Sequence, residues 1–305
     1  MALIVLCSGQ GLQYPGMLDS LHHEAAARPA MKALRHAVGL GPENLERAQI
    51  FDNALAQPLL CASAAGAWAA LEPLLPAPLL FAGYSVGELA AYGCAGALDV
   101  ETLLSLATAR ATAMDGACGQ PQAMLGVRGA NEGLLQTVAA STGIETAIVV
   151  GADHHVLGGT RDSVEAAEAS LAERPSVQLK RLAVSVASHT PLLEPAVAPW
   201  RRALEGAHWR AWSVPVLAGL TGQPVRDRSA AIEALAPQPA RTLRWDLCIE
   251  AMLAAGGRVF LEIGAGNALV KMLQEAAPDV AARAFQDFRG AEGAAAWVKR
   301  ELARL

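Results

Sequence analysis

Ser85 stands at the centre of a Gly-x-Ser-x-Gly motif at residues 83–87, with an apolar run before it and helix-forming residues after it. A strand that turns sharply into a helix at this motif exposes the serine hydroxyl, and the glycines let the two elements approach closely. The helix N-terminus directs backbone N–H groups toward a developing oxyanion. The motif also arises by chance in a chain with 28 glycines, but here a predicted strand and helix flank it in the required order. We therefore predict that Ser85 is a nucleophile.

A serine nucleophile needs a base, and His189 is the best candidate among the seven histidines. It precedes Pro191 at the boundary between a loop and a predicted helix, which is a usual place for functional residues. The other six lie in an early polar segment, on predicted helix surfaces or in a turn: His22, His23, His36, His154, His155 and His208. A lone histidine is more often structural than catalytic, so position alone only ranks His189 first.

Arg110 lies in a predicted helix over residues 100–113 whose other residues are largely apolar. A guanidinium in such a setting must find a partner or reach water. A structural ion pair or a side chain that extends to solvent would satisfy it, and so would an anionic ligand. A Gly9-Gln10-Gly11 loop after the first predicted strand is open to two readings as well, because it suits both an ordinary turn and a backbone that approaches a ligand.

The elements that must position these residues predict an α/β protein with an inserted subdomain. Residues 3–7, 79–83, 215–220 and 258–263 read as strands of the main domain, and a long alanine-rich helix is expected to open at Gln57-Pro58, with the proline in its first turn. Residues 122–185 read as strand, helix, strand, strand, helix, strand, which suggests a ferredoxin-like insert. We therefore assign residues 1–121 and 186–305 to the main domain.

The amino-acid composition of the chain argues against several classes of partner and site. The net charge is −5, from 24 basic and 29 acidic residues that are scattered along the chain, which argues against nucleic acid and anionic membranes as partners. We expect no membrane span and no signal peptide, because the apolar residues are mostly alanines in amphipathic runs and the N-terminal run is short. Five cysteines without a C-x-x-C pair suit reduced thiols in a cytoplasm, without a zinc site.

Five motifs occur in an order that resembles the malonyl-CoA:acyl-carrier-protein transacylase family. They are Gly9-Gln10-Gly11, Gly83-x-Ser85-x-Gly87-Glu88, an arginine about 25 residues later, Ser188-His189, and Glu262-Ile263-Gly264-x-Gly266. Each motif is weak alone, but together they span nearly the whole chain. The resemblance implies an α/β-hydrolase-like domain with a parallel sheet and a ferredoxin-like insertion, which agrees with the elements above.

The resemblance also implies roles for individual residues. Ser85 matches the acylated nucleophile and His189 its general base, and Arg110 looks like the arginine that pairs with the malonyl carboxylate. Gln10 and Val86 match the positions whose backbone N–H groups form the oxyanion hole. Gln238 looks like the residue whose main-chain carbonyl orients the histidine, and Gln57 resembles a supporting glutamine. The expected reaction moves a malonyl group from malonyl-CoA to the prosthetic thiol of a carrier protein through a seryl ester, without a metal or a permanently bound cofactor.

Three departures from the family pattern point to a particular branch. Tyr84 stands where the family usually has histidine, Cys7-Ser8 replaces Phe-Pro, and Ala265 replaces the proline of Gly-Pro-Gly. The segment Tyr-Ser-Val-Gly-Glu-Leu-Ala-Ala resembles the epsilon subunit of malonate decarboxylase, whose carrier is the delta subunit. We expect that role, with the transacylase of fatty acid or polyketide synthesis as the alternative.

Two further functions stay open at this point. A serine esterase or thioesterase uses the same elbow, usually with an acidic residue between serine and histidine in chain order. Asp99, Asp115, Asp153 and Asp162 fall in that interval, but none follows a strand late in the fold as such an acid usually does. A non-catalytic subunit that docks a carrier protein is the other possibility, and the joint presence of Ser85, His189, Arg110 and Gln10 argues against it.

Overall fold

A six-stranded, mainly parallel sheet forms the centre of the computed structural model, which describes residues 2–39 and 49–305. The strand order is β11-β10-β1-β2-β7-β8, and only β8 runs antiparallel to its neighbour. The strands are β1 Leu3–Cys7, β2 Leu80–Gly83, β7 Val216–Leu217, β8 Pro224–Val225, β10 Val259–Ile263 and β11 Ala281–Ala284. Four of these strands, β1, β2, β7 and β10, are buried along their whole length, as expected for a parallel sheet covered on both faces.

The register of the central strands brings three loops to one edge of the sheet. Cys7 at the end of β1 pairs with Gly83 on one side and with Ile263 on the other. The residues that follow these three strands therefore emerge next to one another, although they are far apart in the sequence. The carboxyl edge of a parallel sheet is the usual place for a ligand site in an α/β protein.

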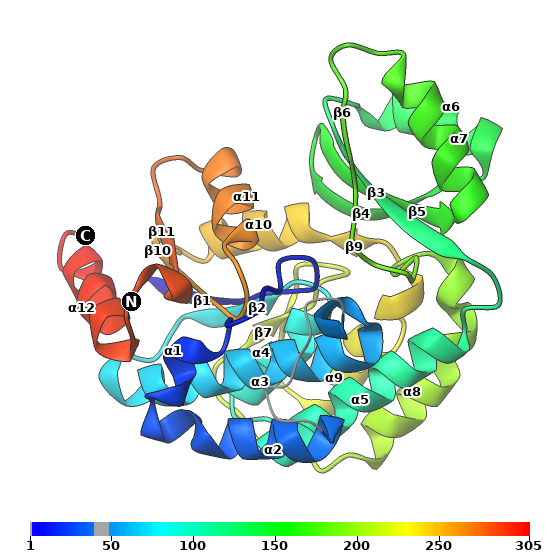
Figure 1. Cartoon of the computed structure of the whole chain (residues 1–305). Helices are drawn as coiled ribbons and strands as arrows, with labels where there is room; N and C mark the ends of the chain where they lie inside the picture. The colour runs from blue at the N-terminus through cyan, green and yellow to red at the C-terminus, as the bar shows by residue number, and fades with distance from the viewer. Residues whose placement is uncertain (1, 40–48) are drawn as a thin grey trace.

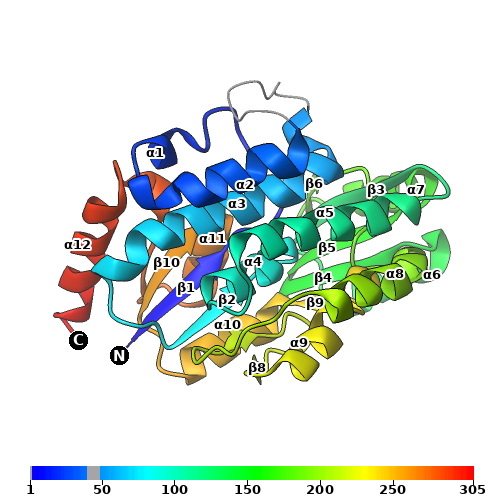
Figure 2. The same cartoon turned by 90° about the horizontal axis from the view of Figure 1, so that it is seen from below.

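Helices cover both faces of this sheet (Figures 1 and 2). Alternate residues of β1 point to opposite sides: Leu3 and Val5 join the larger core with α2–α5, α8, α9 and α12, whereas Ile4 and Leu6 join the core under α10 and α11. The helices are α1 Asp19–His22, α2 Arg28–Val38, α3 Asn53–Leu71, α4 Val86–Cys94, α5 Val100–Gly116, α6 Glu132–Thr142, α7 Arg161–Ala172, α8 Glu194–Gly206, α9 Arg228–Leu235, α10 Trp245–Ala254, α11 Ala268–Ala276 and α12 Ala291–Leu302.

Helix α3 begins four residues earlier than the sequence predicts. Its first residue is Asn53, so Pro58 lies inside the helix rather than in its first turn. The missing N–H of Pro58 costs one intrahelical bond, which the packing of a nearly fully buried helix offsets. The earlier start places Asn53 and Gln57 one turn apart on the same face of the helix, where they contact each other.

The same segment bears on the expectation that the chain has no membrane span. Asn53–Leu74 is long and apolar enough to cross a membrane, and it is the one such stretch among the described residues. However, 83% of its most apolar window is buried inside the protein. The segment is therefore the core helix of the main domain.

A second sheet forms a smaller subdomain that rises from the main body (Figure 1). Its strands are β3 Gln122–Arg128, β4 Glu145–Gly151, β5 His154–Thr160 and β6 Gln178–Arg181, and with α6 and α7 they follow the predicted order of elements. These four strands pair antiparallel. A fifth strand, β9 Leu243–Arg244, comes from the main domain and pairs with β4, which the sequence does not predict. The predicted fold class is confirmed, and the division at residues 122 and 185 stays a prediction.

Candidate active site

Ser85 occupies a strained turn between β2 and α4. Its backbone has φ 57° and ψ −115°, and Ser85 is one of two non-glycine residues with positive φ in the described part of the chain. The turn is possible because Gly83 and Gly87 carry no side chain: a Cβ on Gly83 would enter the backbone of Gly87, and a Cβ on Gly87 would enter the carbonyl of Cys7. A strained backbone held by such tight packing is typical of functional sites.

Two backbone segments converge at the turn that carries Ser85. Val86 is the first residue of α4, and the first N–H groups of a helix have no acceptor inside it. The Gly9-Gln10 loop lies against the elbow, since a Cβ on Gly9 would be 2.5 Å from the carbonyl oxygen of Tyr84. The segments that carry Gln10 and Val86 are thus brought together at the carboxyl edge of the sheet.

His189 contacts Ser85 directly. Its Nε2 lies 2.8 Å from Ser85 Oγ, and its Nδ1 lies 2.8 Å from the main-chain carbonyl oxygen of Gln238. A carbonyl oxygen only accepts, so Nδ1 carries the proton and Nε2 of the neutral ring is free to accept the serine proton. His189 is the second residue with positive φ, at 65°, and its own N–H donates to the carbonyl of Pro239. The backbone on both sides of the ring therefore fixes its position.

The histidine is kept neutral by its surroundings. Burial, and secondly the positive charge of Arg110, lower the pKa of His189 to about 3. The hydrogen bond to the Gln238 carbonyl opposes this shift. At neutral pH the ring is therefore unprotonated and available as a base.

Arg110 lies at the same point of the molecule, fully buried. Its Nη1 donates to Gln57 Oε1 at 2.9 Å, and its Nη2 donates to Gln238 Oε1 at 2.8 Å and to Ser85 Oγ at 3.3 Å. Burial lowers the pKa of Arg110 to about 10, so the guanidinium still carries its charge at neutral pH. All three hydrogen-bond partners among the described residues are neutral, which leaves the cation without a directly paired carboxylate.

A chain of polar side chains holds Gln57 in place. Gln57 Nε2 donates to Asn53 Oδ1 at 2.6 Å, and Asn53 Nδ2 donates to Asp115 Oδ1 at 2.9 Å. With the Gln57 amide nitrogen engaged in this way, its oxygen is turned toward Arg110. The sequence indicates a role for Gln57 only through the family resemblance. The contacts of Asn53 with Gln57 and Asp115 could not be predicted, because the sequence predicts that α3 begins at Gln57 and so leaves Asn53 outside the helix.

Glu88 is a buried residue of the site that sequence analysis did not single out, although it belongs to the quoted motif. Its Oε2 accepts from the backbone N–H of Gly219 at 2.9 Å and from Gln238 Nε2 at 2.7 Å. Burial raises the pKa of Glu88 to about 7, against the effect of these hydrogen bonds and of Arg110. The sequence does contain one sign of this role, because Glu88 is a carboxylate on an otherwise apolar helix directly after the serine motif.

A second buried carboxylate supports the loop that carries Gln10. Glu262 Oε1 accepts from Ser8 Oγ at 2.9 Å, and its Oε2 accepts from the N–H of Val270 in the first turn of α11 at 3.0 Å. Burial raises the pKa of Glu262 to about 7. Ser8 and Glu262 thus tie the end of β1 to the end of β10 immediately before the Gly9-Gln10 turn.

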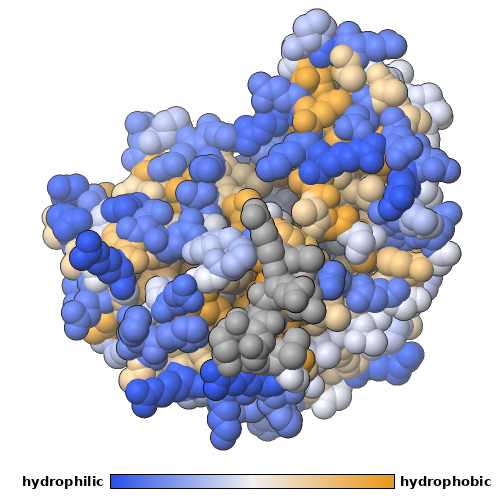
Figure 3. Space-filling model, viewed as in Figure 1, coloured by the Kyte–Doolittle hydropathy of each residue, from blue (hydrophilic) through white to orange (hydrophobic). Residues whose placement is uncertain are grey.

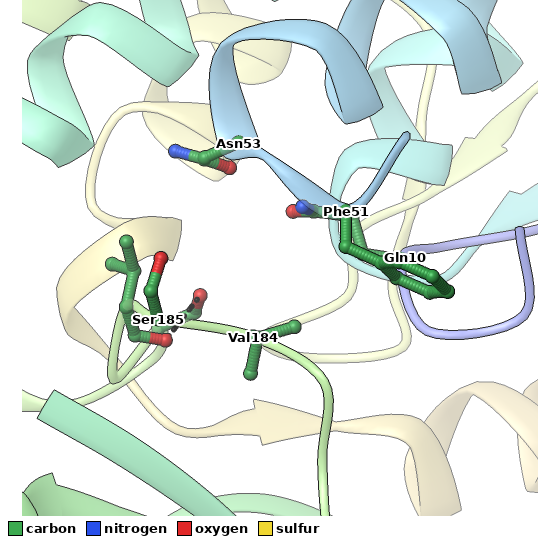
Figure 4. A pocket seen from close by; sticks show the side chains of 7 residues that line it. Gln10, Phe51, Asn53, Val184 and Ser185 are labelled. Atoms are coloured by element: carbon green, nitrogen blue, oxygen red, sulfur yellow. Dashed lines mark hydrogen bonds between the residues drawn. The ribbon is translucent and has the colours of Figure 1, made fainter. Parts of the chain in front are cut away.

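A pocket opens beside these residues, between the main body and the subdomain (Figure 4). It is lined by segments from the loop after β1, from the start of α3 and from the chain that returns from the subdomain: Gln10, Phe51, Asn53, Val184, Ser185, Val186 and Ser188. Ser188 and Asn53 connect this pocket to His189 and Gln57 respectively. The space-filling view shows a hollow where the subdomain meets the main body (Figure 3).

None of the four acidic residues considered for a hydrolase triad is hydrogen-bonded to His189. Asp99 caps α5 and pairs with Arg210, and Asp115 accepts from Asn53. Asp153 and Asp162 belong to the subdomain, in the turn before β5 and in the first turn of α7. The Nδ1 of His189 contacts a backbone carbonyl in place of a carboxylate. Within the described ranges, no group of three or more His, Cys, Asp or Glu residues is arranged to hold a metal ion.

Comparison with known proteins places the chain in a family. Residues 4–292 match the family model described as "Acyl transferase domain". Among curated proteins, the malonyl CoA-acyl carrier protein transacylase of Mycobacterium tuberculosis H37Rv is 30% identical over 256 residues, which cover 81% of this chain and 83% of that protein.

Solved structures agree with the sequence comparison. The malonyl-CoA:acyl carrier protein transacylase of Xanthomonas oryzae pv. oryzae has a TM-score of 0.88 and 27% identity, with 98% of each chain covered. The acyltransferase domain from the second module of the salinomycin polyketide synthase has a TM-score of 0.84 and 30% identity, with 97% of this chain and 73% of that chain covered. The chain therefore belongs to the acyl transferase domain family and is a homologue of malonyl-CoA:acyl-carrier-protein transacylases.

Proposed function

We propose that the protein transfers a malonyl group from malonyl-CoA to the prosthetic thiol of an acyl carrier protein, through an ester on Ser85. The observation that carries this proposal is the position of Arg110: a buried cation with neutral partners lies 3.3 Å from the serine hydroxyl. A buried charge is costly unless it is paired, so an anion is the expected further partner of this guanidinium. The acyl group on Ser85 would supply it.

The first half of the reaction follows from the contacts of Ser85. His189 Nε2 accepts the hydroxyl proton, Ser85 Oγ forms a bond to the thioester carbonyl carbon, and the C–S bond then breaks. The proton held by His189 passes to the departing CoA sulfur. The N–H groups of Gln10 and Val86 stabilise the oxyanion between these steps, and loss of one such donor typically lowers turnover by about 10²–10³.

The second half reverses the first. The carrier thiol gives its proton to His189 Nε2, its sulfur attacks the ester carbonyl, and the bond to Ser85 Oγ breaks with return of the proton to the serine. The Gln238 carbonyl holds Nδ1–H throughout, so the ring keeps the orientation that both halves need. The two halves together regenerate free Ser85 and neutral His189, and no oxidation state changes.

Arg110 explains the preference for a malonyl group. A malonyl carboxylate is one methylene away from the carbonyl that Ser85 attacks, and Arg110 is within hydrogen-bond distance of the attacking oxygen. A guanidinium can bind that carboxylate in a bidentate manner, which favours a charged acyl group over a neutral one of the same length. The carboxylate also offsets the positive charge that lowers the pKa of His189, so binding of the correct acyl group makes the base stronger.

We further propose that the protein acts in fatty acid or polyketide synthesis. The relatives compared above are named as transacylases and a polyketide synthase domain, which favours fatty acid or polyketide synthesis over malonate decarboxylase. The epsilon-subunit role, with the delta subunit as carrier, gains no support from them and rests on Tyr84 and its neighbours alone. Tyr84 packs edge-to-face on Trp245, with the two ring centres 5.4 Å apart.

Transfer to two purified carriers tests this proposal. One carrier bears phosphopantetheine and the other the prosthetic arm of malonate decarboxylase, and each is incubated with malonyl-CoA and the protein. We expect malonyl transfer to the phosphopantetheine carrier. Transfer to the second carrier alone would assign the protein to the decarboxylase, and CoA release at an equal rate without any carrier would indicate a thioesterase.

A further inference from the structure

Three buried side chains form a continuous chain behind Ser85. Arg110 Nη2 donates to Gln238 Oε1 at 2.8 Å, and Gln238 Nε2 donates to Glu88 Oε2 at 2.7 Å. Arg110, Gln238 and Glu88 are all buried, with exposed fractions of 1%, 0% and 0%. A cation and an anion are thus linked through one neutral amide, with the reacting serine at the cationic end.

The amide of Gln238 can lie in only one orientation. A guanidinium only donates and a carboxylate only accepts, so the oxygen of Gln238 must face Arg110 and its nitrogen must face Glu88. The nitrogen also lies 3.3 Å from the main-chain oxygen of Ser85, which again only accepts. Arg110 and the accepting oxygen of Glu88 therefore fix the side chain of Gln238, whose main-chain carbonyl holds His189.

Only one of the two carboxylate oxygens of Glu88 accepts hydrogen bonds from the described residues. Oε2 takes the hydrogen bonds from Gly219 and Gln238, whereas Oε1 is buried and has no hydrogen-bond partner within the described part of the chain. Leaving a carboxylate oxygen unpaired in this way disfavours the charged form. Glu88 can therefore change its charge without the loss of either contact.

We propose that Glu88 is a specificity-determining residue that moderates the attraction of Arg110 for a charged acyl group. It does so through Gln238 and without contact to the substrate. In the free site, the carboxylate of Glu88 partly balances the charge of Arg110, to which it is linked through Gln238. A malonyl carboxylate that binds the guanidinium is repelled by this second negative charge. The inference rests on the proposed function, because it concerns the acyl group that Arg110 binds.

The proposal predicts how selectivity changes with pH. Glu88 titrates near pH 7, because burial raises its pKa to about that value. Below this pH Glu88 is neutral and Arg110 attracts the malonyl group fully, whereas above it the charged carboxylate opposes the malonyl group. The ratio of malonyl to acetyl transfer should therefore fall as pH rises from 6 to 8.5.

The other groups near Glu88 keep their charge over this range. Arg110 stays protonated, and Tyr92 on α4 and Cys248 on α10 stay neutral because burial raises the pKa of both. His189 also stays neutral over this range, because burial and Arg110 lower its pKa to about 3. The change in the ratio is thus assigned to Glu88.

The substitution Glu88→Gln removes the charge of Glu88 and keeps its hydrogen bonds. A glutamine oxygen at the position of Oε2 still accepts from Gly219 and Gln238, and its NH₂ group replaces the unpaired Oε1. We expect E88Q to raise the malonyl-to-acetyl ratio of kcat/KM at pH 8.5 by roughly tenfold, which is the scale of one partly screened buried charge. The ratio of E88Q should not vary with pH.

Glu262→Gln is the matched control. Glu262 is equally buried and its pKa is also raised to about 7, but it contacts Ser8 and Val270 on the other side of the site. E262Q should keep the pH-dependent ratio of the wild type. The wild-type profile tests the proposal even if a variant does not fold.

The outcomes separate this inference from the proposed function. A protein that forms no malonyl ester from malonyl-CoA at any pH would overturn the proposed function itself. Malonyl transfer with a ratio that is flat from pH 6 to 8.5, or a ratio that E88Q leaves unchanged, would overturn the role of Glu88 alone. A ratio that falls in the wild type and in E262Q but not in E88Q would establish it.

Discussion

The guanidinium of Arg110 and the hydroxyl of Ser85 lie 3.3 Å apart, although Arg110 belongs to the third turn of α5 and Ser85 to the elbow before α4. This distance limits the acyl groups that the site favours. An anion that reaches Arg110 must be very close to the carbon that Ser85 attacks, and a carboxylate one methylene away meets that condition.

Arg110→Ala should shift the preference from malonyl to acetyl thioesters. The substitution removes the only cation beside Ser85 among the described residues, so a buried malonyl carboxylate would be unpaired. We expect kcat/KM for malonyl-CoA to fall by roughly 100-fold or more, with a smaller loss for acetyl-CoA. Measurement of both donors in parallel checks this, and an unchanged ratio would exclude the role of Arg110 in acyl selection.

Gln57→Glu should lower the malonyl preference by a different route. The new carboxylate has the same shape as the amide and would accept from Arg110 Nη1, which forms a buried ion pair that competes with the substrate. Gln57→Leu is the control, because it removes the hydrogen bond without adding charge. We expect a lower malonyl-to-acetyl ratio for Gln57→Glu than for Gln57→Leu, and equal ratios would show that charge at this position has no effect.

The reactivity of Ser85 should be nearly independent of pH between about 5 and 8. The pKa of His189 is lowered from its ordinary value to about 3, so the ring remains a neutral base throughout this range. Inactivation by phenylmethylsulfonyl fluoride, a neutral reagent that does not need Arg110, measures this directly. A rate that falls by half near pH 6.5 would mean that His189 titrates as an ordinary histidine.

Gly87→Ala should destabilise the fold as well as the site. A Cβ at this position would overlap the main-chain carbonyl groups of Cys7 and Ser8, which belong to the central strand and its end. We expect a loss of about 3 kcal/mol in the free energy of unfolding, measured by urea denaturation. Gly116→Ala is the control, since no atom outside its own stretch of helix lies within 4 Å of its added Cβ, and we expect its stability to be within about 1 kcal/mol of the wild type.

Much of the site could be predicted because its parts leave local patterns. The elbow needs glycines two residues before and after Ser85, and the apolar strand and helix on either side are visible in the sequence. His189 and Gln238 could be paired only through the family resemblance. They are 49 residues apart and their contact uses a backbone carbonyl, which no side-chain pattern records.

The parts that could not be predicted depend on tertiary packing. The start of α3 at Asn53 overrides the preference of Pro58 for a first turn because the helix is buried on nearly all sides. Strand β9 has two residues, and it forms only because β4 of the subdomain lies beside it. The sequence does not show that Glu88 and Glu262 are buried, because their burial depends on the packing of the whole domain around them.

Intact-mass analysis after mixing the protein with malonyl-CoA tests the central claim most directly. The proposed mechanism predicts one added malonyl group on the wild type, located on Ser85 by peptide mapping, and none on Ser85→Ala. A carrier thiol added afterwards should remove the group. A wild type that gains no malonyl group, or a Ser85→Ala variant that still gains one, would contradict the assignment of Ser85 as the acylated residue.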